Sequence, residues 1–189
     1  MINSFHPGLL MILVGALILV LPDRFKKLCS IVAAAAGILG LFTLNSSSHL
    51  VYQITPDIKL EMIHVDGLSM MFIIIFGIIT VINSIYAFDI QDKWEKGLSV
   101  IYGGSIISAT LAGDIISLIV FWEVAAFSAT YLIYANHTRR SSRSALRYFL
   151  MHAFGGNMLL VGFLLHAAQT NSLVIPKFTI ADGSAAFWF

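Results

Sequence analysis

The stretch "SLIVFWEVAAFSATYLIY", residues 117–134, carries one acidic side chain, Glu123, in the middle of an apolar run. A charged side chain at the centre of a bilayer costs at least roughly 2.5 kcal/mol, so such residues are rare and by default mark ion pathways. A carboxyl group can also take up and release a proton, which is the chemistry of a proton path. The stretch therefore predicts that Glu123 carries protons. The alternative is a hydrogen-bonded packing residue at a helix interface.

A second titratable side chain, His152, lies roughly eight residues into the apolar stretch 144–168. Counted from the opposite membrane surface, this depth is within about 5 Å of that of Glu123. If the two helices pack side by side, the groups meet directly or through a water, and His152 serves as a relay because imidazole exchanges protons near neutral pH. The alternative is a packing histidine. Polar side chains at similar depth would extend the pair into a seam: Ser105, Ser108, Ser128 and Asn157.

The elements that position these side chains are membrane helices. The chain of 189 residues is 58% apolar and 11% charged, against roughly 45–50% and 25% in soluble domains. This composition predicts an all-α polytopic membrane protein with one membrane domain, residues 1–189. The six longest apolar stretches approach the length of about 20 residues that a spanning helix needs. They are residues 7–21, 28–44, 68–88, 98–112, 115–134 and 144–168.

The basic residues predict how these six helices are oriented. Lys and Arg strongly prefer the cytoplasmic side of a membrane. With the N-terminus outside, two of the 11 basic residues lie outside, Lys59 and Lys177. The others lie inside: Arg24, Lys26, Lys27, Lys93, Lys96, Arg139, Arg140, Arg143 and Arg147. The predicted location is therefore the cell inner (plasma) membrane, with the N-terminus outside. The near-neutral net charge gives no reason to expect nucleic-acid binding.

The chain shows no pattern that predicts a metal or a cofactor. Cys29 is the single cysteine, and the six histidines do not show a metal-ligand spacing such as His-Glu-x-x-His. His6, His49 and His64 fall in outer or terminal segments, where we expect solvated surface. The segment "TPDIKLEM", residues 55–62, alternates polar and apolar residues, which predicts a short extended segment on the outer face.

Three longer stretches carry a resemblance. They are "VDGLSMMF" at 65–72, "LAGDIISLIVFWEVAAFSATYLI" at 111–133 and "SALRYFLMHAFGGNMLLVGFLL" at 144–165. They resemble the antiporter-like membrane subunits shared by respiratory complex I, membrane-bound hydrogenases and the Mrp multisubunit cation/proton antiporters. The combination of "AGD", "FWE" and "RYFLMHAFGGN" looks most like the D-type subunits of the Mrp group.

The resemblance implies a fold, a site and partners. In that family the glutamate of the "FWE" motif, which matches Glu123, handles protons together with a lysine on the seventh helix of a bundle of about fourteen. The chain then corresponds to the N-terminal part of such a subunit, and residues 169–189 form an outer tail that leads to a missing seventh helix. The implied partners are other membrane subunits, the bilayer, protons and monovalent cations such as sodium. The chain is then an ion-translocating subunit without a redox cofactor, and not itself an enzyme.

Two alternatives remain at this point. Within the same family, the chain could belong to the proton-pumping membrane arm of a complex-I-like NADH:quinone oxidoreductase or of a hydrogenase. Outside that function, it could be a non-transporting structural or assembly fragment. The residues do not distinguish which cation is exchanged.

Overall fold

The computed structural model describes residues 6–22, 29, 31–33, 35, 37, 40, 42, 44, 48–53, 59–86, 90–170 and 172–175. Its helices are α1 (Pro7–Val20), α3 (Gly67–Tyr86), α4 (Lys93–Leu111), α5 (Ile115–Tyr134) and α6 (Arg139–Thr170). Two strands, β1 (His49–Gln53) and β2 (Lys59–His64), form an antiparallel hairpin. In the predicted span 28–44, the described residues 29, 31–33, 35, 37, 40 and 42 are helical.

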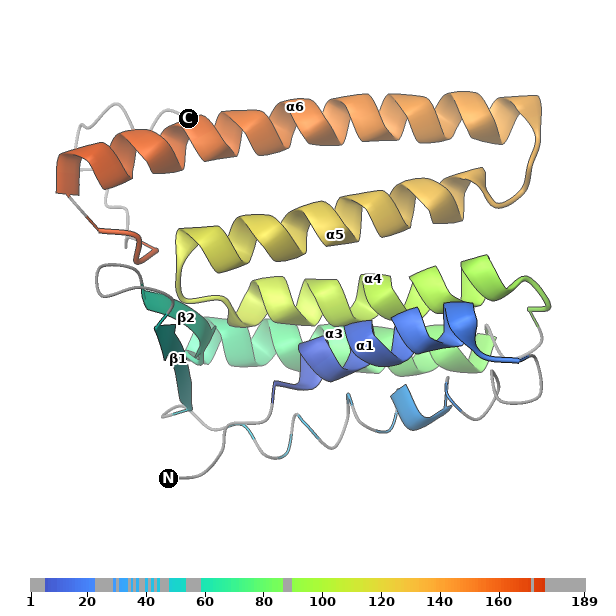
Figure 1. The fold of residues 1–189 in the computed structure, drawn as a ribbon, viewed down its shortest axis with the longest axis horizontal. Helices are drawn as coiled ribbons and strands as arrows, with labels where there is room; N and C mark the ends of the chain where they lie inside the picture. The colour runs from blue at the N-terminus through green and yellow to red at the C-terminus, as the bar shows by residue number, and fades with distance from the viewer. Residues whose placement is uncertain are drawn as a thin grey trace.

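The helices lie roughly antiparallel in one bundle, with the hairpin at one end (Figure 1). The chain enters α1, α3 and α5 at the hairpin end and enters α4 and α6 at the opposite end (Figure 1). α4 packs against α1, α3 and α5, whereas α6 packs against α5. The two helices that carry Glu123 and His152 are therefore neighbours.

Three of the described helices are long and apolar enough to cross a membrane, namely α3, α5 and α6. α1 is a shorter apolar helix of 14 residues. α4 has 19 residues, and three of its first four residues are charged, Lys93, Glu95 and Lys96. The described part of the chain is therefore mostly helical with three candidate spans by this measure.

Several helices begin at a residue that caps their free backbone N–H groups. Asp66 Oδ1 accepts a hydrogen bond from Ser69 N at 2.7 Å at the start of α3, and Asp92 Oδ1 accepts one from Trp94 N at 3.0 Å at the start of α4. Such side chains satisfy donors that have no partner inside the helix. A reciprocal pair of hydrogen bonds between Thr138 and Ser141 starts α6. This cap places the start of α6 at Arg139, five residues before the apolar stretch that begins at 144.

Glycines allow α1 and α4 to approach closely. A Cβ on Gly104 would lie 2.7 Å from the carbonyl oxygen of Gly8, and a Cβ on Gly15 would lie 2.8 Å from that of Gly97. Neither distance leaves room for a methyl group. Small residues at helix interfaces are typical of membrane bundles, where backbone packing replaces the hydrophobic effect as a driving force.

Candidate functional site

Glu123 lies midway along α5 and faces α6. Its side chain is half-buried. A Cβ on Gly156 of α6 would lie 3.0 Å from Glu123 Oε1 and 3.5 Å from the indole nitrogen of Trp122. The absence of a side chain at Gly156 thus makes room for the carboxylate at the α5–α6 interface. No residue in the described part of the chain donates a hydrogen bond to Glu123.

His152 lies at the same interface, one helical turn before Gly156. Its ring stacks on Trp122, with ring centroids 4.9 Å apart, and on Tyr148 of its own helix at 5.6 Å. His152 Nε2 is buried and has no hydrogen-bond partner among the described residues. The ring also borders a cavity of about 490 Å³. The cavity is lined by Phe76, Tyr102, Ile106, Ala109, Thr110, Leu118, Trp122, Ala125, Tyr148 and His152.

The two predicted site residues share one interface but do not touch through a hydrogen bond in the described structure. Trp122 packs on His152, while its neighbour Glu123 packs on Gly156. Consecutive residues of a helix point about 100° apart, and residues four apart on α6 are separated by about 6 Å along the axis. Trp122 therefore contacts His152 and also borders Gly156, the position against which Glu123 packs.

In the described part of the chain, the polar side chains of the predicted seam make no hydrogen bond from one helix to another. Ser105 Oγ donates to Ile101 O at 2.7 Å, and Ser128 Oγ donates to Val124 O at 2.8 Å, so each hydroxyl bonds within its own helix. Ser108 does the same with Gly104 O and packs against Gly8 of α1. Asn157 is exposed and donates to Ala153 O. Each side chain thus donates to a carbonyl of its own helix, and a seam wetted by water between them stays a prediction.

Asp114 is a buried acid that the sequence analysis did not single out. It is 1% exposed and precedes α5. Its Oδ1 accepts from Ser117 N at 2.9 Å, while its Oδ2 accepts from Ser117 Oγ at 2.6 Å and from Glu61 N at 2.8 Å. One carboxylate thus caps α5 and binds the hairpin. The Asp-x-x-Ser pattern at the start of an apolar helix was the signal for the cap, but the contact with β2 had no local signal.

The three histidines expected on solvated surface behave differently. His6 is 6% exposed, accepts a hydrogen bond from Leu9 N at its Nδ1 and lies with Nε2 3.2 Å from Met62 O. The expectation is wrong for His6 because the side chain caps α1 beneath the hairpin. These two contacts require the proton on Nε2. Burial lowers the pKa of His6 from its ordinary value, although the hydrogen bonds to the backbone partly oppose the shift.

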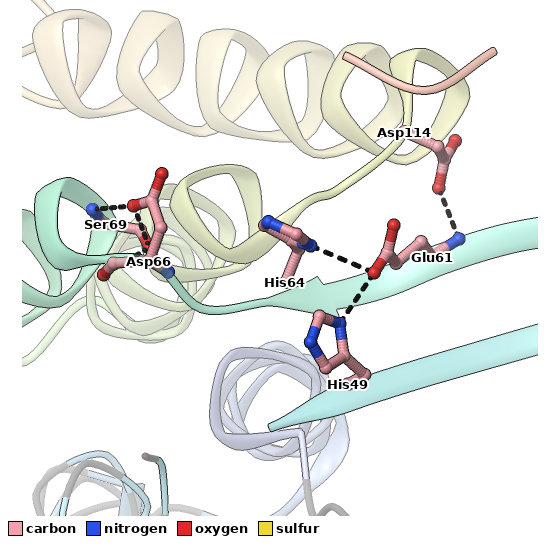
Figure 2. Close-up of polar contacts among 6 residues, drawn as sticks. All are labelled: His49, Glu61, His64, Asp66, Ser69 and Asp114. Atoms are coloured by element: carbon pink, nitrogen blue, oxygen red, sulfur yellow. Dashed lines mark hydrogen bonds and ion pairs between the residues drawn. The ribbon is translucent and has the colours of Figure 1, made fainter. Parts of the chain in front are cut away.

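His49 and His64 are exposed, but they converge on Glu61 (Figure 2). Their Nδ1 atoms lie 2.8 Å and 3.0 Å from Glu61 Oε1. Partial burial acts to raise the pKa of Glu61, but the hydrogen bonds and charges of both histidines outweigh it and hold the pKa below its ordinary value. Although the sequence shows no metal-ligand spacing, the ligand atoms of this set all lie within 4.8 Å of one another. His49 is 12 positions from Glu61 in the chain, so a short spacing motif does not indicate this group of three residues in the sequence.

Comparison with known proteins confirms the resemblance to antiporter-like membrane subunits. Residues 112–187 match the family described as NADH:quinone oxidoreductase/Mrp antiporter, transmembrane. Hydrogenase-4 component B of Escherichia coli is 24% identical over 173 residues, which are 82% of this chain and 25% of that protein. A Staphylococcus aureus protein named as antiporter subunit mnhA2 is 30% identical over 125 residues, which are 62% of this chain and 16% of that protein. The chain therefore spans a quarter or less of the length of these relatives.

Solved structures show the same fold. A chain of respiratory complex I from Thermus thermophilus superposes with a TM-score of 0.75 at 20% identity, covering 89% of this chain and 36% of that chain. A chain of an archaeal membrane-bound sulfane sulfur reductase superposes with a TM-score of 0.68 at 18% identity, covering 90% and 37%. The helical arrangement is thus that of subunits from membrane-bound respiratory complexes.

Proposed function

We propose that this chain forms the Glu123-bearing part of a cation/proton antiporter subunit similar to the D-type subunits of the Mrp group. The observation that carries the proposal is the placement of Glu123. Its carboxylate lies half-buried in a spanning helix, against a glycine that makes room for it, and without a hydrogen bond from the described residues. A packing role at a helix interface is expected to bring fixed hydrogen-bond partners to a carboxylate, and the described residues supply none to this half-buried group. A carboxylate without them suits a group that exchanges protons with mobile water or ions.

The proposed path runs from Glu123 through water to His152. A proton carrier must be able to change its protonation state and its partners. A basic side chain from the rest of the subunit or from a partner subunit would be one such partner for the carboxylate of Glu123. His152 borders the cavity of about 490 Å³ and leaves Nε2 unpaired within the described structure. Because Nε2 is buried in this arrangement, the proposed relay role requires the ring to turn so that Nε2 meets water in that cavity.

In the proposed orientation the hairpin lies on the outer side of the inner membrane. Among the described basic residues, Lys59 lies on the hairpin, whereas six lie in the first turns of α4 and α6, the two helices that begin at the opposite end of the bundle (Figure 1). They are Lys93, Lys96, Arg139, Arg140, Arg143 and Arg147. This distribution supports an N-terminus outside, with α1 and the segment 28–44 completing six passes with α3 to α6. A reporter fused after Arg143 should read cytoplasmic, and an external reading there would reject the orientation.

The test of the function is Glu123→Gln in the assembled complex. The amide has almost the same shape, and a neutral group costs less to bury than a carboxylate, so assembly should stay normal. Cation-dependent proton flux in inverted membrane vesicles should fall to background because an amide does not carry a proton at neutral pH. Glu95→Gln in the first turn of α4 makes the same chemical change away from the interface and should leave flux unchanged. Normal flux with Glu123→Gln would reject the carrier role.

The second candidate is a membrane-arm subunit of a complex-I-like or hydrogenase assembly. The observation that favours it is the similarity to hydrogenase-4 component B over 82% of this chain, together with the fold of complex I. Purification of the chain with its native partners distinguishes the two. A flavin or iron–sulfur arm in the complex would support the respiratory assembly, whereas membrane subunits without redox centres would support the antiporter. A complex that transports normally with Glu123→Gln would favour a structural or assembly role.

A further inference from the structure

The hairpin carries a group of three side chains that the proposed transport path does not use. We propose that His49, Glu61 and His64 form a binding site for a divalent transition metal, with Zn²⁺ as the best fit. The three residues come from both strands of the hairpin, and their ligand atoms all lie within 4.8 Å of one another. Figure 2 shows the two imidazole rings directed toward the same carboxylate oxygen.

A β-bulge brings the three side chains to one face. His49 pairs with His64 and Val51 pairs with Glu61, so β2 has one extra residue, Met62, between the pairs. In a regular strand, residues three apart point to opposite faces. The extra residue reverses the alternation, so that Glu61 and His64 share the exposed face. Bulges commonly re-aim side chains in this way. The buried residues Leu60 and Ile63, also three apart, share the other face.

The backbone around Glu61 is held from the bundle side. Glu61 N donates to Asp114 Oδ2 at 2.8 Å, and Glu61 O accepts from Gly113 N at 2.8 Å. A Cβ on Gly113 would lie 2.7 Å from His64 Cβ and 2.8 Å from Glu61 Cδ. The glycine therefore lets the turn before α5 lie directly behind the group. Such support fixes the positions of the ligands before a metal arrives, which favours binding.

The distances and donor types fit zinc. Zinc bonds to imidazole nitrogen and carboxylate oxygen are near 2.1 Å, so two ligand atoms of a tetrahedral ion lie about 3.4 Å apart. The two Nδ1 atoms lie 2.8 Å and 3.0 Å from Glu61 Oε1, so each nitrogen–oxygen pair needs to open by a few tenths of an ångström, while the ligand atoms of the two histidines lie within 4.8 Å of each other. Imidazole ligands favour zinc, copper or nickel over magnesium or calcium.

The site is open on its outer side. The side chains of His49, His64 and Glu61 are 47%, 45% and 20% exposed. An ion held by three protein ligands keeps a fourth position, which water or a donor from a neighbouring subunit can fill. A bound ion would link β1 to β2 and, through Glu61, to the start of α5. The proposal does not depend on the transport function, since the ligands lie at the end of the bundle.

The test is metal titration of the purified chain in detergent, with an affinity tag that contains no histidine. We expect one equivalent of Zn²⁺ by calorimetry, displaced by a chelator. Loss of a residue that only hydrogen-bonds to a metal ligand weakens metal affinity about 10–100-fold. Loss of a ligand itself should weaken it at least as much, so we expect His49→Ala and His64→Ala each to weaken zinc binding more than tenfold. The matched control is His137→Asn in the α5–α6 turn, where φ is 49° and asparagine fits. It should bind zinc as the original chain does.

Cobalt gives a second measurement that needs no variant. Co²⁺ in a four- or five-coordinate site with imidazole ligands gives strong visible absorption, whereas hydrated octahedral Co²⁺ absorbs weakly. We expect the strong bands, and we expect Zn²⁺ to abolish them. Weak bands only, no saturable zinc binding, or equal affinity in the two alanine variants and the original chain would overturn the proposal and leave the group as a hydrogen-bonded surface cluster.

Discussion

Replacement of Asp114 by alanine gives the sharpest test of how the hairpin and α5 are joined. The carboxylate accepts from Ser117 N, Ser117 Oγ and Glu61 N. Loss of an N-cap acceptor costs about 0.5–2 kcal/mol. Loss of the acceptor for the Glu61 amide leaves a poorly hydrated donor, which costs about 1–3 kcal/mol more. We therefore expect Asp114→Ala to lower the free energy of unfolding by roughly 3 kcal/mol.

Two measurements check this value. For a chain of this size, each kcal/mol shifts the midpoint of thermal unfolding by about 2–4 °C, so the expected fall in detergent is roughly 6–12 °C. Hydrogen exchange at the Glu61 amide should also accelerate, because its acceptor is gone. Asp92→Ala is the matched control, since Asp92 caps α4 by accepting from Trp94 N at 3.0 Å and has, besides this cap, a long bond from the Tyr131 hydroxyl at 3.4 Å. It should cost about 1 kcal/mol and leave exchange at Glu61 unchanged.

An unchanged midpoint in Asp114→Ala would refute the reasoning, since it would mean that water replaces the carboxylate at no cost. A fall equal to that of Asp92→Ala would show that the cap matters and that the contact with β2 does not. Asp114→Asn separates these effects further. The amide nitrogen of the asparagine must face one of the N–H or O–H donors from which the carboxylate accepts. The stability of this variant should therefore lie between that of the original chain and that of Asp114→Ala.

Two further outcomes follow from the same structure. Gly156→Ala should reduce transport without blocking assembly, because the new methyl group would lie 3.0 Å from Glu123 Oε1, whereas Gly155→Ala meets no atom within 4 Å and should be neutral in the same flux assay. The pKa of His6 is lowered in the folded state, so folding favours the neutral imidazole. The contribution of His6 to stability is therefore complete above pH 6.5 and is lost as the pH falls toward the pKa of the folded state. Thermal unfolding between about pH 7.5 and 5 should show this loss, and His6→Asn, which keeps a cap, should flatten it; an equal slope in both proteins would contradict the assignment.

The apolar pattern located the helices well because each spanning segment must satisfy its own backbone hydrogen bonds. The predicted stretch 115–134 coincides with α5, where Asp114 marks the start. The prediction missed the first turns of α6, since "RRSSR" is polar and its helix is set by the cap between Thr138 and Ser141. Hydropathy alone does not register a helix that extends beyond the apolar layer.

The sequence predicted part of the candidate site. Counting depth put Glu123 and His152 at a similar depth, and a shared interface depended on the two helices packing side by side; in the structure both residues lie between α5 and α6. Depth does not fix rotation about the helix axis, so the pairing of Trp122 with His152 was not accessible from spacing. The proton-carrying role of Glu123 stays a prediction.

The hairpin group was beyond the sequence for a different reason. His49 meets Glu61 through strand pairing, and Glu61 meets His64 on one face through a bulge, which has no strong residue signature here. The alternation in "TPDIKLEM" indicated an extended segment, and β2 begins within it at Lys59. The contact with Asp114, 53 positions away, depends on tertiary packing.

The start of α5 and the side chain of Glu123 differ in how firmly they are held, and this difference bears on the proposed mechanism. At the hairpin end, α5 is fixed by Asp114, by Ile115 N donating to Leu173 O at 2.9 Å, and by Ile175 N donating to Gly113 O at 3.2 Å. Further along the same helix, the carboxylate of Glu123 has no such bond from the described residues. A proton carrier needs a backbone that holds its position and a side chain that remains able to change partners. The anchored start of α5 and the unbonded carboxylate supply these two properties in one helix.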